Sequence, residues 1–185
     1  KTVIIDRQNM IDAEAALGYP MVLKIPDGSF SRGVVKAETR DEMTEHAKKL
    51  FQRSDVILAQ QFMYTEFDWR VGVLNRQPLF VSQYFMSRKH WQVVKHGKEG
   101  RFQEGGFKTL AVDQAPAEVV EVALKAAGLI GDGLYGVDLK QTEAGIFIIE
   151  INDNPNLDRG VEDTELKDEL YRTVLKDFVR RIEAR

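Results

Sequence analysis

The stretch Phe147–Asn156 limits the possible folds more than any other part of the chain. Its first half is a run of β-branched and aromatic residues around one glutamate, which is typical of a strand. Side chains alternate between the two faces of a strand, so we expect Glu150 and Asn152 to share one face. The same alternation puts Ile146 and Ile148 on that face. A carboxylate and a carboxamide side by side suit a hard divalent cation such as Mg²⁺.

A second strand is predicted over Gly133–Lys140, where apolar residues alternate with glycine, aspartate and lysine. Only Gln141–Gly145 separates the two strands, which predicts an antiparallel hairpin. Asp138 then lies opposite or diagonal to Glu150, at roughly 5–8 Å between Cβ atoms. Two carboxylates at that distance need a raised pKa, a basic partner or a metal. The alternative is two surface acids on a solvated sheet face, and Asn152 as a third oxygen ligand favours the metal.

Composition excludes several classes of protein. The 185 residues suffice for one domain or two small lobes, and the 43% hydrophobic content can fill a core. A formal net charge of −3 gives no general attraction to nucleic acid or to an anionic membrane. The chain has no cysteine, which fits a reducing compartment, and we expect a cytoplasmic protein. No apolar run is long enough for a membrane span. The absence of an initiator methionine suggests a piece of a longer protein.

The first third predicts a small lobe over residues 1–63 with the order β-α-β-β-α-β. Asp6 is the expected N-cap of a first helix through Leu17, and Thr39 with Glu42 forms a capping box for a second. The segment between the second and third strands is rich in glycine and serine. Such a turn can fold over phosphates, with Lys24 approaching from the incoming strand, although most turns of this composition are plain hairpins. The elements of this lobe are expected at 2–5, 6–17, 21–25, 34–37, 39–51 and 56–60.

The rest of the chain predicts a larger lobe over residues 64–185. Strands are expected at 67–74 and 78–86, and helices from Asp113 or Gln114 to Gly128 and near the C-terminus. Between residues 87 and 108 the periodicity fails and basic residues dominate, which fits either a solvated loop or a mobile basic cover for an anionic ligand. The last helix carries apolar residues at helical spacing that predict ordinary core packing: Leu166, Leu170, Val174, Leu175, Phe178 and Ile182.

A charged group lies between the metal-binding strand and that helix. Asp158, Arg159, Glu162 and Asp163 fit either the wall of a substrate pocket or a solvated lead-in to the helix. We favour the solvated lead-in.

The chain resembles the ATP-grasp superfamily, and within it the RimK-type glutamate ligases, over nearly its whole length. The strongest match joins Gly136–Leu139 to Ile149–Pro155, and the resemblance implies that Asp138, Glu150 and Asn152 bind Mg²⁺, or Mn²⁺, that bridges the ATP phosphates. It also implies the α+β ATP-grasp fold, with two lobes and the nucleotide between them.

Further motifs extend the resemblance along the chain. Lys24 with the hairpin loop is similar to the phosphate-covering segment of the family. Gln60–Met63 resembles the family's inter-lobe hinge, and Asp68-Trp69-Arg70 resembles its Asp-Ile-Arg motif. Ser31, Gln61 and Gln103 depart from the usual pattern. The resemblance implies that ATP is contacted by Lys24, Gly28, Ser29, Ser31, Gln61, Phe62, Asp68 and Arg101. It implies catalytic roles for Arg70 and Arg101.

The implied activity is an ATP-dependent carboxylate–amine ligase that forms an amide or peptide bond through an acyl phosphate, glutamate addition being one form of it. The substrates are a carboxylate and an amine from a small molecule, a peptide or a protein tail, with no nucleic acid and no membrane involved. Full-length ligases have an additional N-terminal domain that is absent here, and a homo-oligomer is compatible with the sequence. The alternative is a non-catalytic, regulatory module that binds ATP and Mg²⁺ and keeps the ATP-grasp fold.

Overall fold

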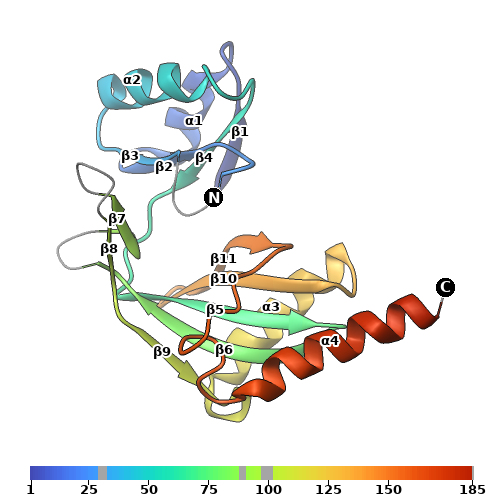
Figure 1. Ribbon diagram of the computed structural model, residues 1–185. Helices are drawn as coiled ribbons and strands as arrows, with labels where there is room; N and C mark the ends of the chain where they lie inside the picture. The colour runs from blue at the N-terminus through green and yellow to red at the C-terminus, as the bar shows by residue number, and fades with distance from the viewer. Residues whose placement is uncertain (29–32, 88–90, 97–101, 185) are drawn as a thin grey trace. The chain divides into compact units, whose positions relative to one another are not determined.

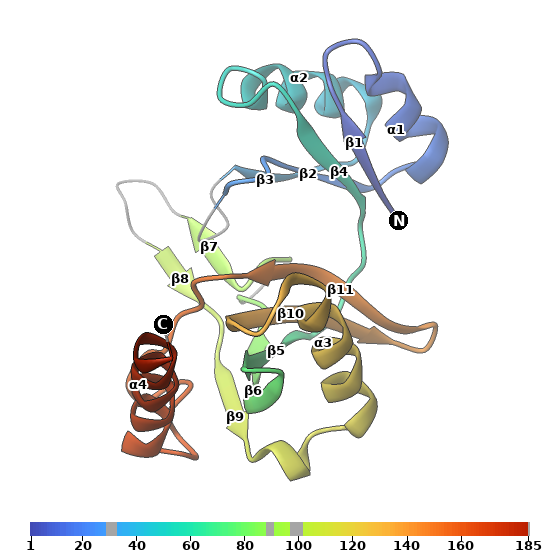
Figure 2. The ribbon, with the colours of Figure 1, turned by 90° about the vertical axis from the view of Figure 1, so that its right-hand side faces the viewer.

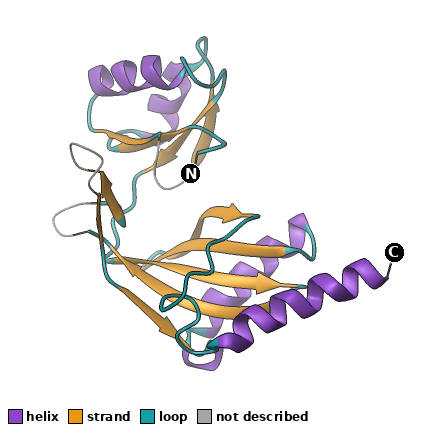
Figure 3. Ribbon diagram, in the orientation of Figure 1, coloured by secondary structure: helices purple, strands orange, loops and turns teal. Residues whose placement is uncertain are grey.

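The computed structural model describes residues 1–28, 33–87, 91–96 and 102–184 (Figure 1). The chain divides into two compact units, Lys1–Tyr64 and Thr65–Arg185. Both units combine helices with antiparallel sheets, as the colouring of Figure 3 shows. In the part of the chain that is described, no helix is long and apolar enough to cross a membrane.

The first unit has the predicted order β-α-β-β-α-β. Its four strands form one antiparallel sheet in the order β1-β4-β2-β3, and both helices contribute side chains to its core. The elements are β1 (Thr2–Ile5), α1 (Met10–Leu17), β2 (Met21–Lys24), β3 (Val34–Ala37), α2 (Arg40–Leu50) and β4 (Ile57–Gln61).

Two helix starts in this unit test the predicted caps. The hydroxyl of Thr39 accepts a hydrogen bond from the backbone N–H of Glu42 at 3.2 Å, which confirms the predicted N-cap of α2. The start of α1 was predicted wrongly. The Asp6 carboxylate accepts from the backbone N–H groups of Gln8 and Asn9, so it closes a local turn, and α1 begins only at Met10.

The second unit is built on a five-stranded antiparallel sheet in the order β11-β10-β5-β6-β9 (Figure 2). A separate two-stranded sheet joins β7 to β8. The elements are β5 (Phe67–Leu74), β6 (Gln77–Phe85), β7 (Val94–His96), β8 (Phe102–Glu104), β9 (Phe107–Leu110), η2 (Val112–Gln114), α3 (Ala117–Ile130), β10 (Leu134–Thr142), β11 (Gly145–Asn152) and α4 (Asp168–Glu183).

The two faces of this sheet are covered differently. Alternate residues of β5 and β10, such as Val71 and Val137, pack with α3 in the larger core cluster. On the other face, α4 packs Leu170 against Leu74 and Phe80 in a smaller cluster. Figure 2 shows α3 and α4 on opposite sides of the strands. The part of the second face that α4 leaves uncovered carries the polar residues described below.

The turn between β5 and β6 has two residues, where three were expected. Asn75 and Arg76 have φ angles of 50° and 62°, the left-handed pair that a type I′ hairpin turn requires. Gln77 therefore already belongs to β6. An arginine in this conformation costs free energy that a glycine would not.

The segment predicted to lack structure contains strands. β9 pairs with β6 as the fifth strand of the sheet, and the hydroxyls of Ser82 and Thr109 lie 2.8 Å apart across that ladder. Sequence periodicity missed β9 because it is only four residues long and its first two side chains, of Phe107 and Lys108, are both exposed. The basic residues predicted as a loop or cover include Arg101, which lies outside the described residues.

Two predicted helices also differ in extent. Pro116 keeps Ala115 in an extended conformation, so Val112–Gln114 forms only a 3₁₀ turn and α3 starts at Ala117. In α4, the prediction of core packing for the whole apolar stripe is wrong. Leu170 and Val174 are buried because they reach the sheet, whereas the remaining apolar residues of the stripe are exposed: Leu166, Leu175, Phe178 and Ile182.

Candidate functional site

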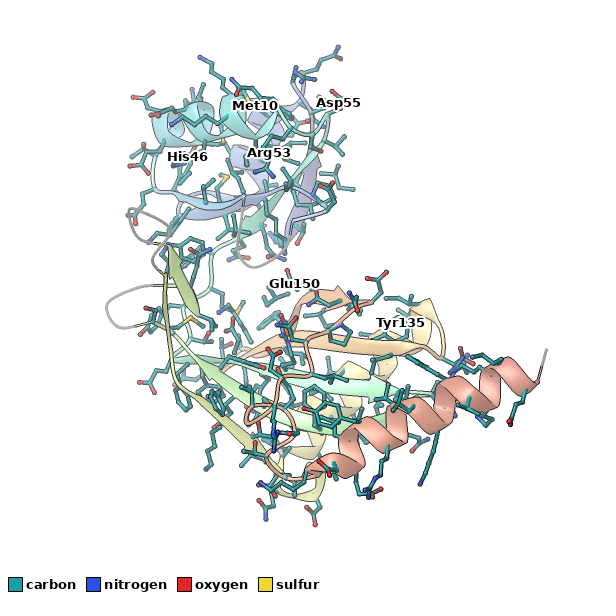
Figure 4. All side chains as sticks on the ribbon, viewed as in Figure 1. Met10, His46, Arg53, Asp55, Tyr135 and Glu150 are labelled. Atoms are coloured by element: carbon teal, nitrogen blue, oxygen red, sulfur yellow. The ribbon has the colours of Figure 1, made fainter. Side chains whose placement is uncertain are left out.

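The hairpin of β10 and β11 brings the predicted carboxylates together. Asp138 pairs directly with Glu150, and Gly136 pairs with Asn152, so the predicted antiparallel register is confirmed. Gly136 has a packing role, because a Cβ atom there would lie 2.7 Å from the side chain of Pro155. The chain after β11 therefore folds back over β10. Figure 4 shows Glu150 on β11.

The predicted face of Glu150 and Asn152 needs a correction. The register shifts between Asp138 and Leu139, so that Ile149 is an extra residue, a β-bulge. Ile146 before the bulge and Ile151 after it both pack into the α3 core. Glu150 and Asn152 therefore lie on the opposite face from Ile146 and Ile148, because the bulge shifts the alternation by one residue.

Arg70 of β5 is the basic partner of Asp138. Its Nε donates to Oδ1 of Asp138 and its Nη2 donates to Oδ2, both at 2.7 Å. The side chains of Arg70 and Asp138 are 19% and 17% exposed, so this two-pronged pair is largely shielded from water. Burial alone would lower the pKa of Arg70, but the Asp138 carboxylate outweighs it and raises that pKa above its usual value.

Glu150 and Asn152 adjoin at the exposed end of the same face. The Nδ2 of Asn152 donates to Oε1 of Glu150 at 3.3 Å. Together with Asp138 they offer carboxylate and amide oxygens, the donors that suit Mg²⁺ or Mn²⁺. No group of three or more His, Cys, Asp or Glu residues among the described ranges could hold a metal ion, so a site here depends on the asparagine.

Asp68 lies one pleat away on β5 and has partners of its own. Its Oδ1 accepts from Nζ of Lys140 and, at 2.9 Å, from the hydroxyl of Thr65. Burial raises the pKa of the Asp68 carboxyl, and the neighbouring Lys140 ammonium opposes that shift. Asp68, which was predicted to contact ATP, is thus part of a polar network on the same sheet.

Sequence reasoning missed the contribution of Tyr84 and Glu162. The Tyr84 hydroxyl donates to Oε1 of Glu162, and Oε2 of the same carboxylate accepts from the backbone N–H of Asp158 at 2.7 Å. Glu162 is 1% exposed and Asp163 is 7% exposed, so the favoured interpretation as a solvated lead-in is wrong for these two residues. It holds for Asp158 and Arg159, which are exposed. The sequence signal was the alternation in β6, which places Tyr84 on the same face as Ser82.

The first unit holds the predicted nucleotide contacts other than Asp68 and Arg101. Lys24 is 8% exposed on β2, on the face opposite the core residue Leu23. Gln61 ends β4 and pairs with Met21, and the Nζ of Lys36 lies 4.9 Å from the centre of the Phe62 ring. Gly28 is exposed. The remaining predicted phosphate contacts, Ser29 and Ser31, lie outside the described residues.

An α+β unit with two helices, followed by an antiparallel sheet that carries acidic and amide side chains, has its counterparts among ATP-grasp ligases. The D-alanine–D-alanine ligase of Bacillus anthracis complexed with ATP superposes with a TM-score of 0.72 at 13% identity, over 100% of this chain and 62% of that one. The ligase PsnB complexed with minimal precursor, Mg and ADP gives a TM-score of 0.61 at 20% identity, over 94% and 53%. These likenesses confirm the predicted α+β ATP-grasp fold.

The protein-family model described as the RimK-like ATP-grasp domain matches residues 3–173 of this chain. This chain belongs to that family, as its motifs predicted. A relative from Sodalis glossinidius, named probable alpha-L-glutamate ligase, is 31% identical over 148 residues, which cover 78% of this chain and 46% of that protein. The chain spans about half the length of the curated relatives it matches.

Proposed function

We propose that this chain carries the ATP-dependent part of a carboxylate–amine ligase that forms an amide or peptide bond through an acyl phosphate. The observation that carries the proposal is the polar face of the second sheet. There Asp138 and Glu150 are direct cross-strand partners, with Asn152 beside Glu150. Membership in the RimK-like family and a relative named as a glutamate ligase support the same chemistry.

In this proposal the polar face holds the metal and the reacting groups. Asp138, Glu150 and Asn152 supply the ligands of Mg²⁺, or of Mn²⁺ in its place. When bound, the ion neutralises phosphate charge and orients the transferred phosphoryl group. Arg70 and Arg101 are the residues proposed to stabilise the negative charge that develops during the reaction.

The proposed nucleotide contacts differ in the part of ATP that each residue would contact. Lys24, Gly28, Ser29 and Ser31 would contact the phosphates, because backbone N–H groups, hydroxyls and a lysine suit anions. Gln61 and Phe62 would contact the adenine, and Asp68 the ribose hydroxyls. For Asp68 this requires its carboxylate to accept from the ribose in addition to Lys140 and Thr65.

The reaction has two steps. A carboxylate oxygen attacks the γ-phosphorus of ATP, the bond from that phosphorus to the bridging oxygen breaks, and ADP leaves. An amine nitrogen then attacks the acyl carbon, the bond to the phosphate oxygen breaks, phosphate leaves and the nitrogen loses a proton. The protein needs to provide positioning and positive charge more than covalent chemistry.

The proposal is tested by ADP release. The chain, or a longer protein that contains it, is incubated with ATP and Mg²⁺ and with a panel of amino acids and of peptides that end in glutamate. We expect release that needs both an amine and a carboxylate, and a product heavier than the acceptor by the mass of the added amino acid less one water. Release that is independent of every candidate acceptor would contradict the ligase proposal.

The alternative is a regulatory module that binds ATP and Mg²⁺ without turnover. The two-pronged contact of Arg70 with Asp138 favours it, since this contact occupies both oxygens of a proposed metal ligand. Calorimetric titration with ATP and Mg²⁺ separates the two functions. Binding without ADP release in any acceptor mixture supports the module, whereas acceptor-dependent release excludes it.

A further inference from the structure

Glu162 is a buried carboxylate outside the proposed metal and nucleotide contacts. Only 1% of the residue is exposed, and both of its oxygens accept hydrogen bonds, one from the Tyr84 hydroxyl and one from the backbone N–H of Asp158. A carboxylate removed from water in this way costs free energy unless its hydrogen bonds and nearby charges compensate. The compensating positive charge is that of Arg70, which contacts the ring of Tyr84.

The ring of Tyr84 supports the guanidinium of Arg70. The Cζ of Arg70 lies 5.1 Å from the ring centre, within the range of a cation–π contact. The Asp138 carboxylate takes two donors of the same guanidinium. Arg70 is therefore held from two directions, by Asp138 and by the Tyr84 ring.

Charge links the ends of this series of contacts. The Glu162 carboxylate is one of the groups that raise the pKa of Arg70, after Asp138. Burial and the same carboxylate raise the pKa of the Tyr84 hydroxyl, so Tyr84 stays neutral and keeps its proton for the hydrogen bond to Glu162. The Arg70 guanidinium thus contacts the Asp138 carboxylate and the Tyr84 ring, and the hydroxyl of that ring donates to the Glu162 carboxylate.

We propose that Glu162, acting through Tyr84, is a positioning residue that holds the Arg70 guanidinium on Asp138. The inference rests on the proposed function in one respect: the proposed function makes Arg70 part of the reaction site. It adds that the segment after β11 controls the orientation of that arginine. Without the Tyr84–Glu162 contact, the ring can tilt and Arg70 loses its second support.

The same segment contains a matched control. The hydroxyl of Tyr171 donates to Oδ2 of Asp163 at 3.2 Å, so a second tyrosine anchors the same segment through the neighbouring carboxylate. Among the described residues, the Tyr171 hydroxyl donates to Asp163 and to the backbone carbonyl of Leu157, and neither hydrogen bond involves Arg70 or Asp138. Tyr171→Phe therefore removes a similar anchor without touching the support of Arg70.

The first measurement observes Arg70 directly. In ¹⁵N-labelled protein, the Nε–H resonance of Arg70, assigned by its loss in Arg70→Lys, reports the hydrogen bond to Asp138. We expect this resonance to shift and broaden in Tyr84→Phe and in Glu162→Gln, and to stay in place in Tyr171→Phe. An unchanged resonance in Tyr84→Phe and Glu162→Gln would overturn the inference, and so would equal changes in all three variants.

The second measurement uses turnover. Supporting residues of this kind typically change activity by about 10- to 100-fold. We expect Tyr84→Phe and Glu162→Gln to lower the kcat of ADP release by about tenfold, and to have less than about a twofold effect when Arg70 is already Ala. Equal losses in both backgrounds would show that Glu162 does not act through Arg70.

The two measurements also separate this inference from the proposed function. If Arg70→Ala keeps full turnover while the resonance still responds to Glu162→Gln, Arg70 is positioned as inferred but the proposed reaction role of Arg70 fails. If Arg70→Ala loses turnover while the resonance ignores Glu162→Gln, the proposed role stands and the inference is wrong. Tryptophan fluorescence of each variant checks that the second unit is folded.

Discussion

The pair formed by Arg70 and Asp138 predicts a measurable share of the stability of the second unit. Its two hydrogen bonds are both 2.7 Å long, and each side chain is less than a fifth exposed. Hydrogen bonds to charged groups contribute about 1.5–3 kcal/mol each, and the remaining exposure argues for the lower end. We therefore expect a coupling free energy of about 2–4 kcal/mol between the two side chains.

The perturbation is a double-mutant cycle with Arg70→Met, Asp138→Asn and both together. Met keeps most of the arginine stem, so the cycle reports the ionic contact more than lost packing. The unfolding free energy is measured in urea by tryptophan fluorescence. Both tryptophans, Trp69 and Trp91, belong to the second unit, so the signal follows the unit that contains the pair.

Magnesium provides a further arm of the same experiment. Arg70→Met leaves Asp138 without its counter-ion, so a divalent cation should stabilise this variant more than the wild type. A cation at a hundred times its dissociation constant adds about 2.7 kcal/mol.

Two results would refute the reasoning. One is a coupling free energy between Arg70 and Asp138 below about 0.5 kcal/mol, the usual error of additivity. Equal stabilisation of both proteins by Mg²⁺ would refute the exchange of arginine for cation.

The remaining predictions concern backbone geometry and charge. Gly136→Ala should lower the unfolding free energy by about 1–3 kcal/mol in urea titrations, because the new Cβ would lie 2.7 Å from a proline side chain. Gly128→Ala is its control in α3 and should stabilise by about 0.5–1 kcal/mol, since nothing lies within 4 Å, and a loss there would contradict the geometry. Arg76→Gly should raise the midpoint of unfolding because it relieves a φ of 62°, and a lower midpoint would argue against strain. The pKa of Asp68 in a ¹³C NMR titration should exceed 3.8 despite Lys140. Because the pKa of Asp68 is raised in the folded state, protonation of this carboxyl adds to the free energy of unfolding. That contribution is complete below the unfolded pKa and is lost as pH rises through the folded pKa. A measured pKa under 3.8 would reverse this pH dependence.

The elements whose evidence is local were predicted well from the sequence. Thr39 and Glu42 are three residues apart, and the α2 cap formed as expected. The hairpin register that pairs Asp138 with Glu150 was also predicted, since the two strands are joined by a short turn. Capping and hairpin pairing depend on neighbours in sequence, which is why these parts of the fold could be derived.

Contacts between segments that are distant in the sequence could not be predicted from it. Arg70 and Asp138 are 68 positions apart, and Tyr84 and Glu162 are 78 apart. Little that is local to Glu162 indicates burial, because charged or polar residues surround it in sequence, with Val161 as the one apolar neighbour. The predicted start of α1 was also wrong, because the carboxylate of Asp6 closes a turn before the helix. For the candidate site, the sequence identified the residue types, whereas the partners of those residues came from the tertiary fold.

The extra residue at Ile149 has a consequence for how this protein can vary. If this strand kept its length but lost the bulge, regular alternation would turn both oxygen-bearing side chains toward the apolar layer beneath α3, even though every proposed ligand was still present. If one residue were instead deleted between Gly145 and Glu150, the bulge would be absorbed and both side chains would stay on the face of Asp138. Exchanging one isoleucine of the run for valine would leave their direction unchanged. The bulged strand and a regular strand one residue shorter are therefore two ways to direct the same side chains, and a homologue one residue shorter here could keep the site without a bulge.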